Sequence, residues 1–272
     1  KDIVKNNLIT ALITVMLTGI PFQGFAEGKG IDKEKIQQDL DKILGDIRHH
    51  YAYLKTKDVN LDCIRDYYGA RIDDLTSPQE TLLLFENLLN EFYDSHVMLN
   101  RNVNASFRIY SPLYATTHNG KTRISAIWKS QIIEPDLSIL GAEVLKFNGM
   151  DFPQALDHFP TRCHDKNSET IRNWIGNKII AGRYNEPRIL TLKLTTGEII
   201  DFDLDKVKVK KDTTLLTTNV QKGIGIIRIN DSLGNNALIT EFDAALDDLM
   251  NSKGLIIDLR NTVSGGNSYV AR

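Results

Sequence analysis

Two short apolar runs near the end of the chain, with a helical segment between them, decide the fold. They read GIGIIRI at residues 223–229 and GLIIDLRNTVSGG at residues 254–266. The segment between them carries apolar residues at three- and four-residue steps, which predicts an amphipathic helix, formed by Leu238, Phe242, Ala245, Leu246 and Leu249. Because a helical crossover joins the two runs, they are expected to be buried parallel strands. Ligands of such sheets sit beyond the carboxyl ends of the strands, where residues 260–266 lie.

Upstream of this βαβ unit, which is expected to occupy residues 216–272, the periodicity predicts a helical region over residues 31–104. Its first helix has a single apolar stripe, made of Ile36, Leu40, Ile43, Leu44, Ile47, Tyr51 and Leu54. A second helix is predicted from Leu61 to Ile72. A third opens at residues 77–80, Ser-Pro-Gln-Glu, which form a capping box with proline in the first turn.

The hydrophobic period changes to two at Ala105, which predicts a β-rich region over residues 105–215. Turn signals at Asn119-Gly120, Asn148-Gly149 and Thr196-Gly197 separate its short β-type runs. These runs are residues 107–110, 123–128, 143–147, 188–194 and 198–204. Two helices are expected to interrupt them, at residues 152–159 and 169–180. The predicted fold class is therefore a multidomain α/β chain: helical, then β-rich, then the start of an α/β domain.

The first residues predict export. Lys1 and Lys5 form a short positive region, residues 8–20 an apolar run, and residues 24–26, Gly-Phe-Ala, a small-x-small cleavage site. This order is typical of a secretory signal over residues 1–26, and the apolar run is too short for a stable membrane span. The alternative is an N-terminal core helix. We expect a periplasmic or extracellular protein with no membrane span in its mature chain.

The two cysteines, Cys63 and Cys163, would meet oxidising conditions outside the cytoplasm. A disulfide between them and two buried free thiols are both compatible with the sequence, since positions a hundred residues apart cannot be paired from sequence alone. The formal net charge of -2 and the pI near 6.3 give no reason to expect nucleic acid or an anionic membrane as partner. No spacing of His, Cys and carboxylates resembles a metal site, and no cofactor is expected.

The loop after the second strand is a candidate oxyanion site. Its paired glycines, Gly265 and Gly266, leave backbone N–H groups uncovered, and such donors suit a developing negative charge. A turn that merely needs positive φ angles is the alternative.

Together these segments resemble the tail-specific (C-terminal-processing) serine protease family, including the tricorn core proteases. In that family a strand is followed by D-L-R-x-N-x-G-G, and here Asp258-Leu-Arg is followed by Asn261 and the two glycines. Residues 140–149, LGAEVLKFNG, are similar to the G-D-x-I-x-x-I-N-G signature of a PDZ domain. The order of parts also matches, from a signal through a helical subdomain ending in D-x-H to a PDZ-like domain and the α/β part. Residues 262–264, Thr-Val-Ser, depart from the family's Asn-Pro-type turn.

The resemblance implies an exported serine endopeptidase that acts on peptides or protein C-terminal regions by acyl transfer. It places the general base at His96 and the residue that orients it at Ser95, with the PDZ-like domain capturing a peptide end by strand addition. It assigns oxyanion or substrate binding to Gly265, Gly266, Arg260 and Asn261. The family's nucleophilic serine and its Lys or Glu partner would lie beyond Arg272, so the chain is expected to be the N-terminal portion of such an enzyme.

Several alternatives stay open. His96 is also compatible with a helix C-terminus that does no chemistry, and in the Ser/Lys branch of the family it would be structural. The chain as a whole is also compatible with a non-catalytic ligand- or peptide-binding protein on the same scaffold, or with an inactive truncated product.

Overall fold

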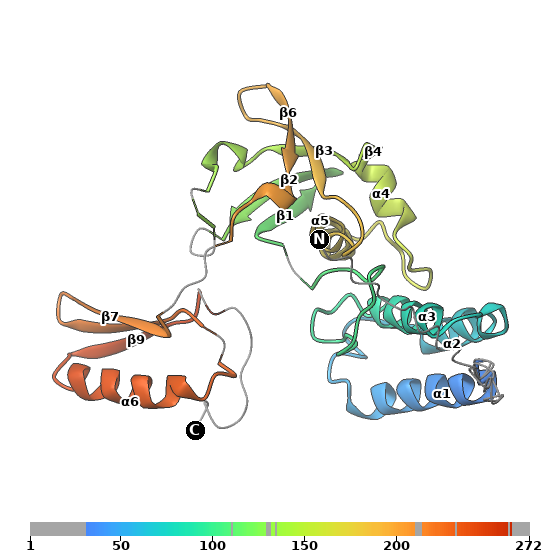
Figure 1. Cartoon of the computed structure of the whole chain (residues 1–272), viewed down its shortest axis with the longest axis horizontal. Helices are drawn as coiled ribbons and strands as arrows, with labels where there is room; N and C mark the ends of the chain where they lie inside the picture. Colours follow the sequence, from blue (N-terminus) through green and yellow to red (C-terminus); the bar gives the residue numbers. More distant parts are fainter. Residues whose placement is uncertain are drawn as a thin grey trace, which may run out of the picture.

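The computed structural model describes residues 31–109, 111–128, 132–133, 135–209, 214–231, 233–260 and 262. Its elements form three groups, each around a hydrophobic cluster of its own (Figure 1). The predicted signal over residues 1–26 lies outside the described residues, as do Asn261, Gly265 and Gly266. The architecture is mixed α/β, as the sequence predicts.

The first group is helical and is built by strong local signals. It contains α1 (Lys33–His50), α2 (Leu61–Gly69), the 3-10 helix η1 (Ile72–Asp74) and α3 (Pro78–Asn90). Both halves of the predicted capping box form, because Ser77 accepts from the Glu80 backbone N–H and Glu80 accepts from that of Ser77. The core contains Ile36, Leu40, Leu44, Ile64, Tyr68, Leu84, Leu88 and Phe92.

Two predicted helix ends in this group are wrong. α1 stops at His50, and Tyr51 is extended, although Tyr51 and Leu54 still pack on the same core. α2 stops at Gly69 and a 3-10 turn follows it. Apolar periodicity therefore continued past both helix ends because the chain stays on the same core after the helix has stopped.

The second group is an antiparallel sheet with strand order β1-β2-β3-β5-β6 and a short strand β4 that pairs with β3. The bounds of its elements are β1 (Leu113–His118), β2 (Lys121–Ile127), η2 (Leu137–Ile139), β3 (Glu143–Phe147), β4 (Met150–Asp151), α4 (Phe152–His158), α5 (Glu169–Ala181), β5 (Ile189–Lys193), β6 (Ile199–Asp203) and η3 (Leu204–Lys206). Turns at residues 119–120 and 148–149 have positive φ at both positions, which is the reason for their Asn-Gly sequence.

The strand predicted at residues 107–110 does not form over its described residues, 107–109, where Phe107 makes only an isolated bridge to Arg183. A strand that the sequence missed, β1, lies directly downstream. Its buried positions are Leu113, Ala115 and Thr117, which alternate with exposed residues. Alanine and threonine give that alternation too little hydrophobic contrast to be recognised.

The third group confirms the predicted βαβ unit. It contains β7 (Leu216–Gln221), β8 (Ile224–Ile229), α6 (Ala237–Leu249) and β9 (Gly254–Asp258), with β8 and β9 parallel. The missed strand β7 forms a hairpin with β8 through Lys222 and Gly223, both at positive φ. The expected burial of the second strand is wrong: Leu255, Ile256 and Ile257 are 43–51% exposed. β9 is an edge strand, and α6 packs over β8 instead.

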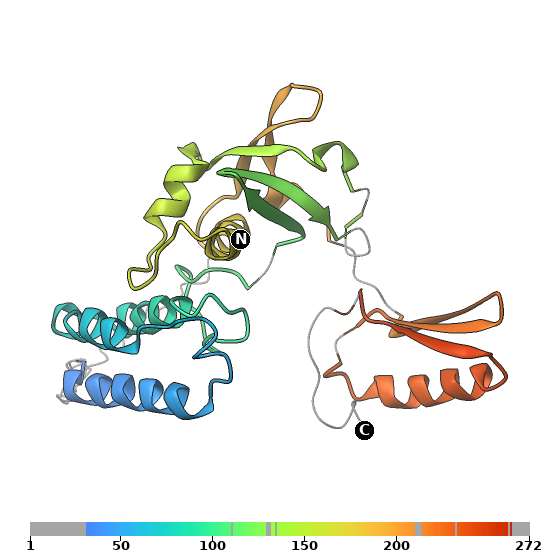
Figure 2. The ribbon, with the colours of Figure 1, turned by 180° about the vertical axis from the view of Figure 1, so that it is seen from behind.

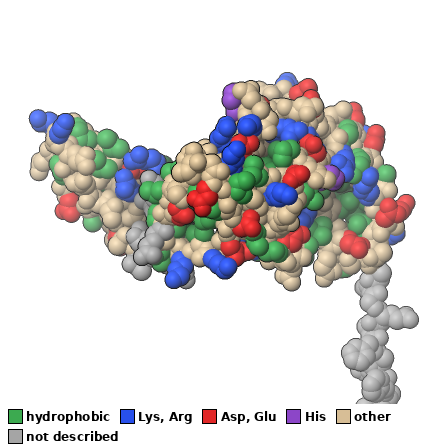
Figure 3. Space-filling model, turned by 90° about the horizontal axis from the view of Figure 1, so that it is seen from above, with side chains coloured by type: hydrophobic (Ala, Val, Ile, Leu, Met, Phe, Trp, Pro, Cys, Tyr) green, Lys and Arg blue, Asp and Glu red, His purple; other side chains and the backbone are tan. Residues whose placement is uncertain are grey.

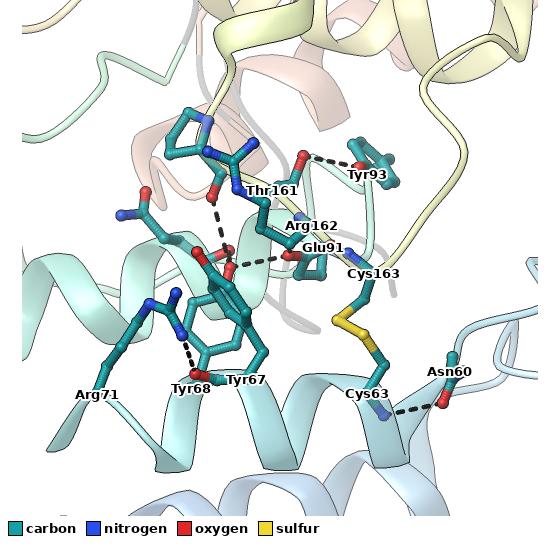
Figure 4. Close-up of a disulfide and its surroundings, with 12 residues drawn as sticks. Asn60, Cys63, Tyr67, Tyr68, Arg71, Glu91, Tyr93, Thr161, Arg162 and Cys163 are labelled. Carbon is teal, nitrogen blue, oxygen red and sulfur yellow. Dashed lines mark hydrogen bonds between the residues drawn. A yellow bond between two sulfur atoms is a disulfide. The ribbon is translucent and has the colours of Figure 1, made fainter.

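A joint made of a disulfide and several hydrogen bonds ties the helical group to the segment that follows α4 (Figure 4). Cys63 on α2 and Cys163 form a disulfide, which settles the pairing that the sequence left open. The completely buried carboxylate of Glu91 accepts hydrogen bonds from the backbone N–H groups of Arg162 (2.6 Å) and Cys163 (3.0 Å) and from the Tyr68 hydroxyl (2.9 Å). Burial raises the pKa of Tyr68 well above its usual range, so its hydroxyl remains a donor.

Candidate functional site

The chain makes a tight corner just after α3, and this corner carries the predicted Ser95–His96 pair. Tyr93 has a φ of 45°, a left-handed conformation that reverses the chain. Asp94 then accepts a hydrogen bond from the His96 backbone N–H at 2.9 Å, and the same oxygen, Oδ1, lies 3.4 Å from Nδ1 of the His96 ring. The imidazole side chain is 98% exposed, so its Nε2 edge is open to a reacting group.

The second carboxylate oxygen of Asp94 is anchored to the helical group. It accepts from the Tyr51 hydroxyl at 2.6 Å and from Lys57 Nζ at 3.2 Å. The same ammonium also donates to the carbonyls of Phe92 and Tyr93, both at 3.1 Å. The corner is therefore fixed before any ligand arrives, which is what a positioned general base requires.

These contacts keep Asp94 ionised. Its burial alone would raise its pKa, but the hydrogen bonds from Tyr51, from the His96 backbone and from Lys57 outweigh burial and lower the pKa to about 2. An ionised carboxylate beside Nδ1 favours the tautomer that carries its proton on Nδ1 and leaves Nε2 as the acceptor.

We expect this corner to make the stability of the protein acid-sensitive. Because the folded-state pKa of Asp94 is depressed, its stabilising contribution is fully present above the ordinary value of 3.8 and is lost as the pH falls from there toward 2. Titration of the Asp94 carboxyl carbon by NMR should give a midpoint near 2, and Lys57→Met should raise it. A midpoint at 3.8 or above in the unaltered protein would contradict the assigned contacts.

A cavity of about 530 Å³ opens beside the corner. The corner residues Asp94, Ser95 and His96 line it together with residues from β1 and α5. Its apolar and aromatic lining residues are Val97, Met98, Ile109, Leu113, Tyr114, Trp128 and Trp174. Pockets of this size and lining are typical of small-ligand and substrate sites.

In the structure the side chain that lies beside the His96 ring is that of Asp94, not that of Ser95. The Ser95 hydroxyl is exposed and makes no hydrogen bond to any residue that the structure describes, whereas Asp94 contacts the imidazole. The sequence contained the relevant signal, a carboxylate two positions before the histidine, but proximity in sequence does not say which side chain turns toward the ring. Asp94 is thus the neighbour of the His96 ring that the sequence analysis did not single out.

Arg260 lies on the third group, at the end of β9. Its backbone N–H and its Nε donate to Asp258 Oδ1 at 3.1 and 2.8 Å, and its terminal nitrogen lies 2.7 Å from Oδ2. Arg228 Nε donates to that same Oδ2 at 2.9 Å, and the pKa of Asp258 lies well below its usual range because of these two guanidinium groups, Arg260 first. In the D-L-R sequence the aspartate thus binds the side chain of the arginine two positions later, at the end of the strand.

The predicted site residues fall in two separate places. Ser95 and His96 share the corner at the cavity, whereas Arg260 sits with the β7–β9 group, which lies apart from α1–α3 (Figures 1 and 2). The remaining loop residues, Asn261, Gly265 and Gly266, lie outside the described part of the chain. The structure therefore brings the two catalytic candidates together and leaves their relation to the glycine loop as a prediction.

Within the described residues, no group of three or more His, Cys, Asp or Glu side chains is arranged to hold a metal ion. None of the helices described in the chain is both long and apolar enough to span a membrane. On the face seen in Figure 3, acidic and basic side chains are interspersed.

Residues 32–90 match the family model of the tricorn protease C1 domain. The matched segment begins just before α1 and ends with α3, directly before the corner that carries Asp94 and His96. The match confirms the predicted resemblance to the tricorn-type proteases over this part of the chain and supports a protease family.

Solved structures of low identity also align with the chain. The crystal structure of mature CPAF has a TM-score of 0.47 at 12% identity, covering 87% of this chain and 56% of that one. Mature CPAF complexed with lactacystin has a TM-score of 0.49 at 12% identity, with 88% and 58% covered. The photosystem II D1 C-terminal processing protease has a TM-score of 0.42 at 14% identity, with 86% and 62% covered. The chain thus spans less than two thirds of these proteins, and no curated protein matches it.

Proposed function

We propose that the chain is part of an exported serine endopeptidase of the tail-specific type, which cleaves peptides or protein C-terminal regions by acyl transfer. The observation that carries the proposal is the Asp94–His96 corner, where an anchored carboxylate contacts Nδ1 of an open imidazole. The match of residues 32–90 to a protease domain supports it.

In the proposed reaction His96 acts as the general base. Nε2 takes the proton from a serine hydroxyl supplied by chain beyond Arg272, and the serine oxygen attacks the scissile carbonyl. The resulting oxyanion would accept hydrogen bonds from the backbone N–H groups of Gly265 and Gly266. The imidazolium then gives its proton to the departing amine, and water releases the acyl group by the same steps in reverse order. Asp94 stabilises the imidazolium, in place of the role first given to Ser95.

The third group supports a continuation of the α/β part. β9 exposes three consecutive large apolar side chains, Leu255, Ile256 and Ile257, at the edge of its sheet. An exposed apolar edge strand is a surface that proteins normally cover. We infer that further chain of the complete enzyme packs there, and that Arg260 and Asn261 belong to the substrate-binding wall of the α/β domain at residues 216–272.

The proposal also includes the remaining domain assignments. Residues 31–104 would be the helical subdomain and residues 105–215 a PDZ-like domain, whose signature-like stretch forms β3 and the turn after it. Export is supported by the Cys63–Cys163 disulfide, since such bonds persist in oxidising compartments.

A second function is favoured by one observation, the aromatic cavity itself. A non-catalytic ligand-binding protein would need such a cavity and would not need the corner. Treatment of the complete gene product with a fluorophosphonate probe separates the two functions. We expect covalent labelling of one serine, because the probe reacts with activated serine hydroxyls. Absence of labelling in the folded complete protein would reject the peptidase and favour the binding protein.

A further inference from the structure

The cavity beside the corner has a feature that proteolysis does not require. The residues that line it include one lysine, Lys178 on α5, and no arginine. Its ammonium lies 5.8 Å from the Trp174 ring centroid and 5.9 Å from that of Phe107, so two aromatic rings are its neighbours. Trp128 also lines the same cavity.

Lys178 lacks a counter-ion in the described part of the chain. No carboxylate there comes within ion-pair distance of its ammonium, and the side chain makes no hydrogen bond to a described residue. Burial lowers its pKa and so does Arg183, while Glu86 acts in the opposite direction. Glu86 accepts its hydrogen bond from the Phe107 backbone N–H at 3.0 Å. A cation held among aromatic rings with no anion in contact is a binding determinant for an anionic group.

The adjacent edge of the sheet is closed to a peptide strand. β1 is an edge strand, and three of its alternate N–H groups already donate within the chain. Leu113 donates to Ser111 Oγ (3.1 Å), Ala115 to Asn177 Oδ1 (2.8 Å) and Thr117 to Asn173 Oδ1. Asn177 Nδ2 also donates to the Ala115 carbonyl at 2.8 Å.

Two asparagines of α5 therefore occupy the positions that the backbone of an added strand would take. A peptide entering the cavity along β1 would leave its own N–H and C=O groups without partners, and each such group costs about 1–3 kcal/mol when buried. The expected capture of a peptide by strand addition is disfavoured at this edge. A ligand without backbone amides meets no such cost.

We propose that the cavity between the Asp94–His96 corner and α5 binds a monocarboxylate with a single apolar chain, with Lys178 as the partner of the carboxylate. The apolar chain would lie against Trp128, Trp174 and Met98, and burial of each methylene contributes about 0.8 kcal/mol. The cavity volume of about 530 Å³ lies within the range of small-molecule sites. The proposal goes beyond the peptidase reaction and does not depend on it.

The two tryptophans make the test direct, because the chain contains only two and both line this cavity. Octanoate should produce a saturable change in tryptophan emission. Octan-1-ol and octylamine should bind at least about tenfold more weakly, since a charge-assisted hydrogen bond is lost or replaced by repulsion. Equal affinity for octanoate and octan-1-ol, or no saturable change with octanoate, would overturn the proposal.

Single substitutions test whether octanoate binds at Lys178. Lys178→Met should weaken octanoate binding at least about tenfold and leave octan-1-ol binding unchanged, which also shows that the cavity is intact. Lys35→Met, an exposed lysine on α1, makes the same chemical change elsewhere and should alter neither affinity. Octanoate binding that survives Lys178→Met would contradict the assignment.

The carboxylate that Lys178 binds could belong to a single-chain acid or to the C-terminus of a peptide. A short apolar peptide with a free carboxyl terminus distinguishes the two. We expect it to compete with octanoate only weakly, because Asn173 and Asn177 hold the edge of β1. If the peptide bound at lower concentrations than octanoate, two claims would be wrong: that the ligand has a single apolar chain, and that the edge of β1 is closed to a peptide. Fluorophosphonate labelling is read on a different residue, so failure of either proposal leaves the other distinguishable.

Discussion

Replacing His96 with alanine is expected to lower kcat/KM for peptide hydrolysis by the complete enzyme by roughly 10²–10⁴-fold, the range that a positioned general base contributes. The physical reason is the loss of the proton acceptor for the serine hydroxyl. The imidazole is exposed and packs in no core, so the variant should keep the unfolding free energy of the parent. Steady-state cleavage of a fluorogenic peptide and urea unfolding of the same preparation measure the two quantities.

Neighbouring variants separate the roles within the corner. Ser95→Ala should change kcat/KM by less than about threefold, because the Ser95 hydroxyl has no hydrogen-bond partner in the described structure. Asp94→Asn should lower kcat more than it changes KM, because a neutral amide no longer stabilises the imidazolium. If His96→Ala turned over peptide at the parental rate, the proposed role of His96 would be wrong. Loss of activity in Ser95→Ala equal to that in His96→Ala would restore the original assignment of Ser95.

The sequence predicted those parts of the fold whose signals are local. The capping box at Ser77 and Glu80 and the Asn-Gly turns form as predicted because each depends on a few adjacent residues. The parallel pairing of β8 and β9 also follows from the helix between them. The errors at helix ends have a related cause. Apolar periodicity indicates which residues are buried, and the chain can stay buried after a helix has ended.

The missed features depend on contacts between distant residues. The anchoring of Asp94 comes from Tyr51 and Lys57 in the turn after α1, some forty positions upstream. The closure of β1 comes from Asn173 and Asn177, more than fifty positions downstream. The residue types alone do not indicate these contacts. An asparagine on a helix, for example, is ordinarily a surface residue. The pairing of Cys63 with Cys163 is a contact of the same kind.

The second prediction with a large expected effect concerns the stability that this disulfide contributes. Replacing both cysteines with serine should lower the free energy of unfolding by about 3–4 kcal/mol, because the bond closes a long loop whose entropy the unfolded chain would otherwise regain. The two cysteines are separated by 100 positions, near the upper end of that effect. Urea and thermal unfolding measure the loss, which corresponds to a decrease in Tm of roughly 10 °C for a chain of this size. Full reduction of the parent protein should reproduce the loss, which excludes an effect of the serines themselves.

We expect the hydrogen bonds of Glu91 to keep the joint in place when the disulfide is absent. Its carboxylate holds the backbone of Arg162 and Cys163 whether or not the sulfurs are linked, so the double serine variant should fold with the joint in place. Adding Glu91→Ala should then cost more than it does in the disulfide-bonded parent, because the segment after α4 loses its second attachment and its buried N–H groups lose their acceptor. Additive losses would mean that the two attachments act independently. An unfolding free energy unchanged to within about 0.5 kcal/mol in the double serine variant would show that the disulfide does not stabilise the joint.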